Sequence, residues 1–240
     1  MDEMSVALSY CRLRLLPARA RRFFRASSDI RAFPLAPPAA AAAAASSQPV
    51  PLPPLPPSLF DVDCNLTHEA FAGQEEAMLS AAAEVGVARM LVPGSTLAES
   101  AVAATLAARH PDHVRTTVGV HPYEAGAYAG VDALAALRAE VRTHAVAQSD
   151  WVVAVGECGL DYSEGFPERT LQLGVFEAQL SAACDLQLPL FVHERLAFED
   201  AKGMFLERQA RLPPVLVHCF TGTRAVRCDG EGVKDRTARL

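Results

Sequence analysis

Short apolar runs and longer amphipathic segments alternate strictly between Leu59 and His218. The short runs are typical of buried parallel strands, and they cover Leu59–Val62, Met90–Val92, Val114–Val120, Trp151–Val155, Leu188–Val192 and Val215–Val217. The longer segments repeat apolar residues near i, i+3, i+4 and i+7, which predicts helices, and they cover Gln74–Val85, Leu97–Ala108, Val131–Ala147, Glu168–Leu186 and Arg195–Gln209. This alternation predicts an α/β fold with a parallel sheet, either open and doubly wound or closed as a barrel.

Residues 1–57 differ from the rest of the chain in composition. They hold seven Arg, several Ser and paired aromatic residues, but only three acidic residues, which is typical of an organellar transit peptide. A disordered basic arm is the alternative. The Ala- and Pro-rich part from Ala39 to Pro57 is typical of a polyproline II linker, which cannot bury a core. We therefore expect a mitochondrial or plastid location, with a cytoplasmic one as the alternative.

The folded domain is expected to span residues 58–223. Residues 224–240 show neither a helical stripe nor strand alternation, and we predict that they form a disordered tail. No run approaches the ~20 apolar residues that a membrane helix needs, so no transmembrane segment is predicted. The six cysteines lie far apart without a C-x-x-C pair, which argues against a zinc ribbon or a disulfide framework.

The predicted domain is strongly acidic. Residues 58–223 carry ten basic and 22 acidic residues, a net charge of −12. A basic face that follows the phosphates is the usual electrostatic feature of a nucleic-acid-binding protein, and this composition does not provide one. Any polyanionic substrate would therefore have to be held by something other than Lys and Arg.

Polar side chains that can do chemistry gather at the ends of the predicted strands. In parallel α/β folds the carboxyl ends of the strands meet at one edge, and functional sites are assembled there. Five of the six strands end in or lead into such residues, which are Asp61, Asp63 and Asn65, then His121, Glu157, His193 and His218. The sequence therefore predicts one shared site at this edge.

Three of these residues, Glu157, His193 and His218, form a predicted metal-binding set. Carboxylate and imidazole ligands suit a divalent cation such as Mg²⁺, Mn²⁺ or Zn²⁺. Each His taken alone is more often a structural residue than a ligand. Glu157 directly follows the apolar run WVVAVG, where a charge must find a cation or several donors. A bound cation would also hold a phosphate that an acidic surface repels.

The segment around Glu157 is expected to form a tight turn. Gly156 and Gly159 flank the carboxylate, where the backbone is expected to approach a ligand. Asp161 in the same segment is either a helix-capping or supporting residue, or itself a ligand. Arg195 is predicted either to pair with a phosphate oxygen or to be a solvated residue that opens a helix.

Five motifs occur in order between Phe60 and Thr223, and they are FDVDCNLTHEAF, GVHP, GECGLDY, LPLFVHER and VHCFTGT. Together they resemble the TatD family of metal-dependent deoxyribonucleases. The resemblance implies a TIM barrel of the metallo-dependent hydrolase superfamily that hydrolyses phosphodiester bonds, often as a 3′ to 5′ exonuclease on DNA. It implies that Glu157, His193 and His218 bind one or two metal ions and that His121 lines the pocket. The catalytic candidates are therefore Glu157, His121 and Arg195.

The sequence departs from the family pattern in two places. Asp63 and Asn65 stand where many members have H-x-H, although one branch also lacks that pair; Asp63 is either an oxygen ligand or a simple strand-end residue. The family's chain continues past the HCFTG motif and includes an Asp that binds metal, whereas residues 224–240 contain nothing similar. We therefore expect a C-terminally truncated, incomplete barrel of about six of the usual eight strands, with weak or absent activity.

The expected function is hydrolysis of phosphodiester bonds in DNA, with single strands or 3′ ends as substrate. Divalent cations held by the predicted metal-binding set would bind the scissile phosphate and activate a water molecule. Two alternatives stay open at this point. One is a related enzyme acting on amides or lactones of small molecules, and the other is a truncated fragment without catalytic activity.

Overall fold

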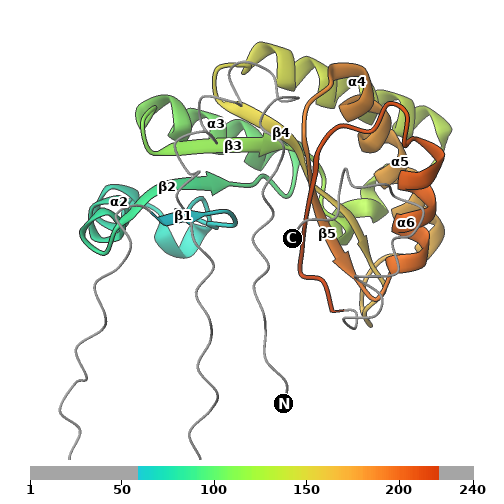
Figure 1. The fold of residues 1–240 in the computed structure, drawn as a ribbon, viewed down its shortest axis with the longest axis horizontal. Helices are drawn as coiled ribbons and strands as arrows, with labels where there is room; N and C mark the ends of the chain where they lie inside the picture. Colours follow the sequence, from blue (N-terminus) through green and yellow to red (C-terminus); the bar gives the residue numbers. More distant parts are fainter. Residues whose placement is uncertain (1–58, 222–240) are drawn as a thin grey trace, which may run out of the picture.

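The computed structural model describes residues 59–221, which Figure 1 draws as a coloured ribbon. The predicted transit peptide, linker and disordered tail lie outside the described residues and stay predictions. Among the helices of residues 59–221, none combines the length and the apolar character needed to cross a lipid bilayer.

One parallel sheet of six strands, in the order β1-β2-β3-β4-β5-β6, forms the centre of the described chain. The strands are β1 (Leu59–Asp61), β2 (Val87–Val92), β3 (Val114–Val118), β4 (Val152–Asp161), β5 (Leu190–Arg195) and β6 (Val215–His218). Each strand pairs with the next one in sequence, and the sheet curls as part of a barrel wall (Figure 1). This confirms the α/β fold of TIM-barrel type with six strands, because a doubly wound sheet would reverse its strand order.

Five α-helices connect the strands, and two 3₁₀ helices follow β1 and β3. They are η1 (Glu69–Phe71), α2 (Glu75–Glu84), α3 (Leu97–Arg109), η2 (Pro122–Tyr128), α4 (Val131–Ala147), α5 (Arg169–Leu186) and α6 (Phe198–Glu207). The start of α3 shows why its position was predictable. The Thr96 hydroxyl accepts a hydrogen bond from Glu99 N–H, as an N-cap residue does, and the Glu99 carboxylate accepts one from the N–H of the preceding residue, Ser95. The start predicted for α6 is wrong, since Arg195 belongs to β5.

The two faces of each strand bury different sets of side chains, because successive residues point to opposite sides. In β5, Leu190 and Val192 belong to the large core under the helices, whereas Phe191 belongs to a smaller cluster on the other face. His193 therefore shares a face with Phe191. β6 repeats the pattern and places its last residue, His218, on that same face.

β4 is longer than predicted, since it continues past Val155 and Glu157 to Asp161. All ten of its residues are buried. Gly156 and Gly159 have φ values of 146° and 136°. A Cβ on Gly156 would lie 2.2 Å from the Phe191 carbonyl oxygen, and one on Gly159 would lie 2.0 Å from that of His193. The expected tight turn is therefore wrong. The glycines let β4 run directly against β5, and both Glu157 and His193 lie within strands.

Candidate metal centre

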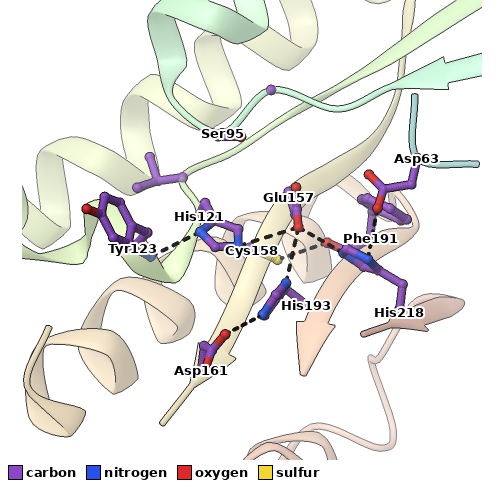
Figure 2. Close-up of polar contacts among 12 residues, drawn as sticks. Asp63, Ser95, His121, Tyr123, Glu157, Cys158, Asp161, Phe191, His193 and His218 are labelled. Atoms are coloured by element: carbon purple, nitrogen blue, oxygen red, sulfur yellow. Dashed lines mark hydrogen bonds and ion pairs between the residues drawn. The ribbon is translucent and has the colours of Figure 1, made fainter. Parts of the chain in front are cut away.

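Four polar side chains meet at the carboxyl-terminal end of the sheet (Figure 2). Glu157 is central: its Oε1 atom lies 3.3 Å from His193 Nδ1, 2.9 Å from His218 Nε2 and 3.5 Å from His121 Nε2. β4, β5 and β6 supply three of these residues, and the loop after β3 supplies the fourth. The other two residues of the predicted metal-binding set and His121 are thus all within contact distance of the Glu157 carboxylate, although no group of ligand atoms within 4.8 Å of one another contains all three members of that set among the described residues.

A buried carboxylate orients His193. The Nε2 atom of its ring lies 2.8 Å from Asp161 Oδ2, and Asp161 Oδ1 accepts a hydrogen bond from Ser163 N–H at 2.8 Å. Burial raises the pKa of Asp161, but hydrogen bonds from Ser163 and His193 outweigh burial and lower it. An ionised carboxylate accepts hydrogen bonds, so we assign the ring proton of His193 to Nε2. The lone pair on Nδ1 then faces Glu157.

His218 lies between two carboxylates. Its Nδ1 atom is 3.2 Å from Asp63 Oδ2, on the side opposite to Glu157. Its ring stacks on Phe191, with 4.4 Å between the centroids and 6° between the planes. Burial lowers the pKa of His218, but Asp63 and Glu157 outweigh burial and raise it to about 10. This point of the site therefore favours a positive charge.

Glu157 is ionised. Burial raises its pKa, but the neighbouring imidazoles of His193 and His218 outweigh burial and hold the pKa well below its usual range. The carboxylate therefore keeps its negative charge although its side chain is only 11% exposed.

The residues fit a divalent cation. His193 Nδ1 and His218 Nε2 are buried and have no hydrogen-bond partner, since neither nitrogen is aligned with the nearby Glu157 carboxylate for a hydrogen bond. Buried polar atoms are normally paired. A cation bound by both nitrogens and the carboxylate would satisfy all of them, with the ion taking the place of the proton that Asp63 and Glu157 favour on His218. Neutral imidazole and carboxylate are common ligands of such ions.

His121 is placed differently from the other two histidines. Its Nδ1 atom accepts a hydrogen bond from Tyr123 N–H at 3.1 Å, so we assign the ring proton to Nε2, which faces Glu157. Burial, only partly offset by Glu157, lowers the pKa of His121 to about 4. A neutral ring in this tautomer supports the carboxylate as a hydrogen donor and does not present a lone pair to an ion.

Potential ligand atoms within 4.8 Å of one another occur in two overlapping groups of the described chain. One group holds His121, Glu157 and His193, and the other holds His193, His218 and Cys219. Cys219 is exposed, and the sequence reasoning did not single it out. Its position directly after His218 in the strand-end loop was the available signal.

Arg195 lies at the exposed end of β5. Its carbonyl oxygen accepts a hydrogen bond from Tyr162 N–H at 3.1 Å. Among residues 59–221, no hydrogen bond or ion pair joins the Arg195 side chain to Glu157 or to the three histidines. Its pairing with a phosphate stays a prediction.

Two buried glutamines of α5 support the site from behind, and the sequence reasoning missed both. The Gln179 side chain accepts a hydrogen bond from Val120 N–H at 2.7 Å and donates one to Val120 C=O at 2.9 Å, next to His121. Gln172 binds the backbone N–H and C=O of Asp161 in the same way, at 2.8 and 2.7 Å. The two glutamines stand seven residues apart, which places them on one face of the helix. Polar residues within an otherwise apolar stripe were the available signal.

Comparison with known proteins supplies the family. The model of the family described as TatD related DNase matches residues 60–229. The chain belongs to this family. The match begins at the second residue of β1 and covers all six strands, so it includes every residue of the candidate metal centre.

Relatives named 3′-5′ ssDNA/RNA exonuclease TatD share more than a third of their aligned residues with this chain. The one from Erwinia tasmaniensis is 40% identical over 166 residues, which are 69% of this chain and 61% of that protein. The one from Pantoea ananatis is 39% identical over 166 residues, with the same shares. The chain thus spans about 61% of the length of these relatives.

Solved structures of similar proteins share the fold. YJJV, a TatD homologue from Escherichia coli, is 28% identical with a TM-score of 0.59, covering 68% of this chain and 61% of that one. A TatD family hydrolase from Entamoeba histolytica is 23% identical with a TM-score of 0.62, covering 70% of this chain and 60% of that one. An uncharacterized amidohydrolase from Saccharomyces cerevisiae is 22% identical with a TM-score of 0.61, covering 77% of this chain and 67% of that one. The last two likenesses concern the fold alone.

Proposed function

We propose that this protein hydrolyses phosphodiester bonds of single-stranded DNA or RNA from the 3′ end, with a divalent metal ion as cofactor. The observation that carries the proposal is the pair of buried, unpartnered imidazole nitrogens beside the ionised Glu157 carboxylate. Membership of the TatD related DNase family and the exonuclease names of the relatives support a nucleic acid as the substrate.

Glu157, His193 and His218 would hold the ion. When bound, a divalent cation supplies a charge that polarises a phosphate oxygen and lowers the pKa of a water molecule. The donor set suits Mg²⁺, Mn²⁺ or Zn²⁺.

The other residues of the site keep these ligands in the correct state. Asp161 holds the proton on His193 Nε2, so that Nδ1 stays unprotonated, and Asp63 faces His218 Nδ1 in a similar way. The Nε2–H group of His121 faces the Glu157 carboxylate and restrains it. Carboxylates that orient a ligating imidazole also raise its basicity.

The charge of the domain makes a cation necessary for binding a polyanion. Residues 58–223 carry a net charge of −12, which repels phosphates over the length of the sheet. The carboxyl edge of the sheet, where the Asp63 and Glu157 carboxylates flank His218, is the place where a bound cation would overcome this repulsion locally.

Cleavage of labelled DNA by the full chain tests the proposal. With Mg²⁺ or Mn²⁺, we expect a 5′-labelled single strand to be shortened slowly from its 3′ end, in keeping with the weak activity expected from the sequence, and we expect EDTA to stop the reaction. Glu157→Gln keeps the shape of the side chain but removes its charge, so both cleavage and Mn²⁺ binding by calorimetry should be lost. Glu140→Gln, on the exposed side of α4, is the matched control. Equal cleavage by wild type and Glu157→Gln would overturn the proposal.

A substrate panel separates this function from an amidohydrolase acting on small molecules. We expect turnover of a phosphodiester and none of a cyclic amide, because the site offers donors for a cation that binds phosphate. Turnover of the amide alone would contradict the proposed function.

We further propose that residues 1–57 direct the protein to a mitochondrion or plastid, based on their Arg- and Ser-rich composition. A fluorescent fusion of these residues should accumulate in one of these organelles. A fusion that stays in the cytosol would overturn this part of the proposal.

A further inference from the structure

A pocket of about 660 Å³ lies beside the candidate metal centre. The loops after β1, β2, β3 and β4 line it, and His121 belongs both to the pocket and to the group of side chains around Glu157. Its volume falls within the range of sites that bind small organic ligands. A molecule in this pocket would therefore lie next to the Glu157 carboxylate.

Two aromatic rings form the apolar part of the pocket. Tyr123 is 60% exposed, and its ring meets Phe166 edge-on with 5.5 Å between the centroids. Phe166 lies 6.2 Å from the ring of His121. Figure 2 shows Tyr123 beside His121, on the side away from His218. An exposed aromatic ring next to a nuclease centre offers a face on which any nucleobase can stack.

The polar part of the pocket is acidic. Glu69, Glu99 and Glu124 line it, and the described residues around it include no Lys or Arg. Carboxylates repel a phosphate, but they accept hydrogen bonds from hydroxyl and amino groups. The pocket therefore favours the part of a nucleotide that carries no phosphate.

We propose that this pocket binds the 3′-terminal nucleoside of the substrate strand. The base packs against Tyr123 and Phe166, the free 3′-hydroxyl group lies toward the carboxylates, and the adjacent phosphate reaches the cation that Glu157 would hold. The proposal rests on the proposed function, because it needs a nucleic acid at the metal centre. It also explains how an acidic domain accepts a polyanion end-first: the part that enters the pocket is uncharged.

Fluorescence of 2-aminopurine tests the position of the terminal base. This base is quenched when it stacks, so a single strand with 2-aminopurine at its 3′ end should lose fluorescence on binding the full chain with Mg²⁺. The same base at the 5′ end should not. A phosphorothioate at the last linkage slows cleavage during the measurement.

Substitutions of Tyr123 show whether its ring is the group on which the terminal base stacks. Tyr123→Ala should weaken binding about tenfold, the loss expected for one stacked base. The variant keeps the backbone N–H that binds His121, so the metal centre should still bind Mn²⁺. Tyr123→Phe should restore most of the quenching that Tyr123→Ala loses. Val131→Ala, at an 81% exposed position of α4, is the control.

A 3′-phosphate tests the acidic part of the pocket. We expect a strand with a 3′-phosphate to bind about tenfold more weakly than one with a 3′-hydroxyl, because like charges would be brought together. The double variant Glu69→Gln/Glu124→Gln should reduce this difference, and Glu140→Gln should leave it unchanged.

The outcomes separate the two proposals. The pocket proposal would be overturned, with metal-dependent cleavage intact, if 2-aminopurine were quenched equally at the 3′ and 5′ ends. Equal binding of strands that end in a 3′-hydroxyl and in a 3′-phosphate would overturn it in the same way. Absence of both binding and cleavage, in a folded chain, would overturn the proposed function together with it.

Discussion

The centre of the sheet and its two ends are built differently. All ten residues of β4 and five of the six residues of β5 are buried. In the described strands β1 and β6 no residue is buried to this degree, and neither is any residue of α2, which follows β1 in the chain. Glu157 and His193 thus stand on a tightly packed base, whereas Asp63 and His218 belong to the less packed ends.

This difference separates residues that determine the site from residues that adjust it. At the centre, backbone contacts and buried hydrogen bonds fix the candidate ligands Glu157 and His193, so a substitution leaves clashes or unpaired groups that nothing can relieve. At the ends, solvent and side-chain rotation relieve part of the loss. Substitutions at the centre should therefore lower the free energy of unfolding or the metal affinity more than substitutions at the ends.

Gly159→Ala should have the largest effect. Its new Cβ would lie 2.0 Å from the His193 carbonyl oxygen, on a backbone with φ of 136°. We expect a loss of roughly 3 kcal/mol in the free energy of unfolding, measured with urea. Gly203→Ala is the control: no atom lies within 4 Å of its Cβ, and a helix gains about 0.5–1 kcal/mol from this change. A Gly159→Ala protein as stable as the control would show that β4 and β5 are not in direct contact.

Gln179→Leu should have the second largest effect. It removes hydrogen bonds of 2.7 and 2.9 Å and leaves both backbone groups of Val120 buried without partners. We expect a loss of about 2–3 kcal/mol in the free energy of unfolding by urea titration. Gln209→Leu, at an exposed position after α6, should stay within about 0.5 kcal/mol of wild type. A stable Gln179→Leu protein would mean that other groups satisfy Val120.

Asp161→Asn should weaken metal binding without unfolding the chain. The amide no longer provides an ionised acceptor for His193 Nε2–H, so the ring is held less firmly in the ligating tautomer. We expect Mn²⁺ affinity by calorimetry to fall about 10–100-fold. Asp132→Asn, at the exposed start of α4, should bind as wild type does. Unchanged affinity in Asp161→Asn would contradict the tautomer assigned to His193.

Asp63→Asn should have the smallest effect. Asp63 faces His218 Nδ1 at 3.2 Å but is 41% exposed, so water replaces part of the lost interaction. We expect Mn²⁺ affinity to fall by at most about fivefold, as for an exposed ion pair. A loss as large as that of Asp161→Asn would break the distinction between the centre and the ends of the sheet.

The order of strands and helices was predictable, because buried strands and amphipathic helices repeat their apolar residues with different periods. The extent of β4 was not. Glycines on both sides of a polar residue ordinarily mark a turn, but Gly156 and Gly159 instead make room for the backbone of β5. Their role depends on a strand about 30 residues further along the chain, which a local pattern does not contain.

The ligand candidates were predictable for a similar reason, and their supporting residues were not. Glu157, His193 and His218 each follow an apolar run, so the topology of a parallel sheet alone brings them together. Gln179 reaches Val120 across 59 residues, and this contact depends on the rotation of α5 against the sheet. Polar groups that bind backbone inside a core leave only a weak signal, namely an interruption of the apolar stripe.

The close approach of β4 to β5 at Gly156 and Gly159 also limits the size of the cation that the candidate site could accept. Two strands whose main chains touch cannot slide apart to admit a wider ion, so the spacing between Glu157 and His193 is nearly constant. His218, at the end of the sheet, would then be the candidate ligand whose position changes with ionic radius. Selectivity among cations would depend on how far the last strand can shift.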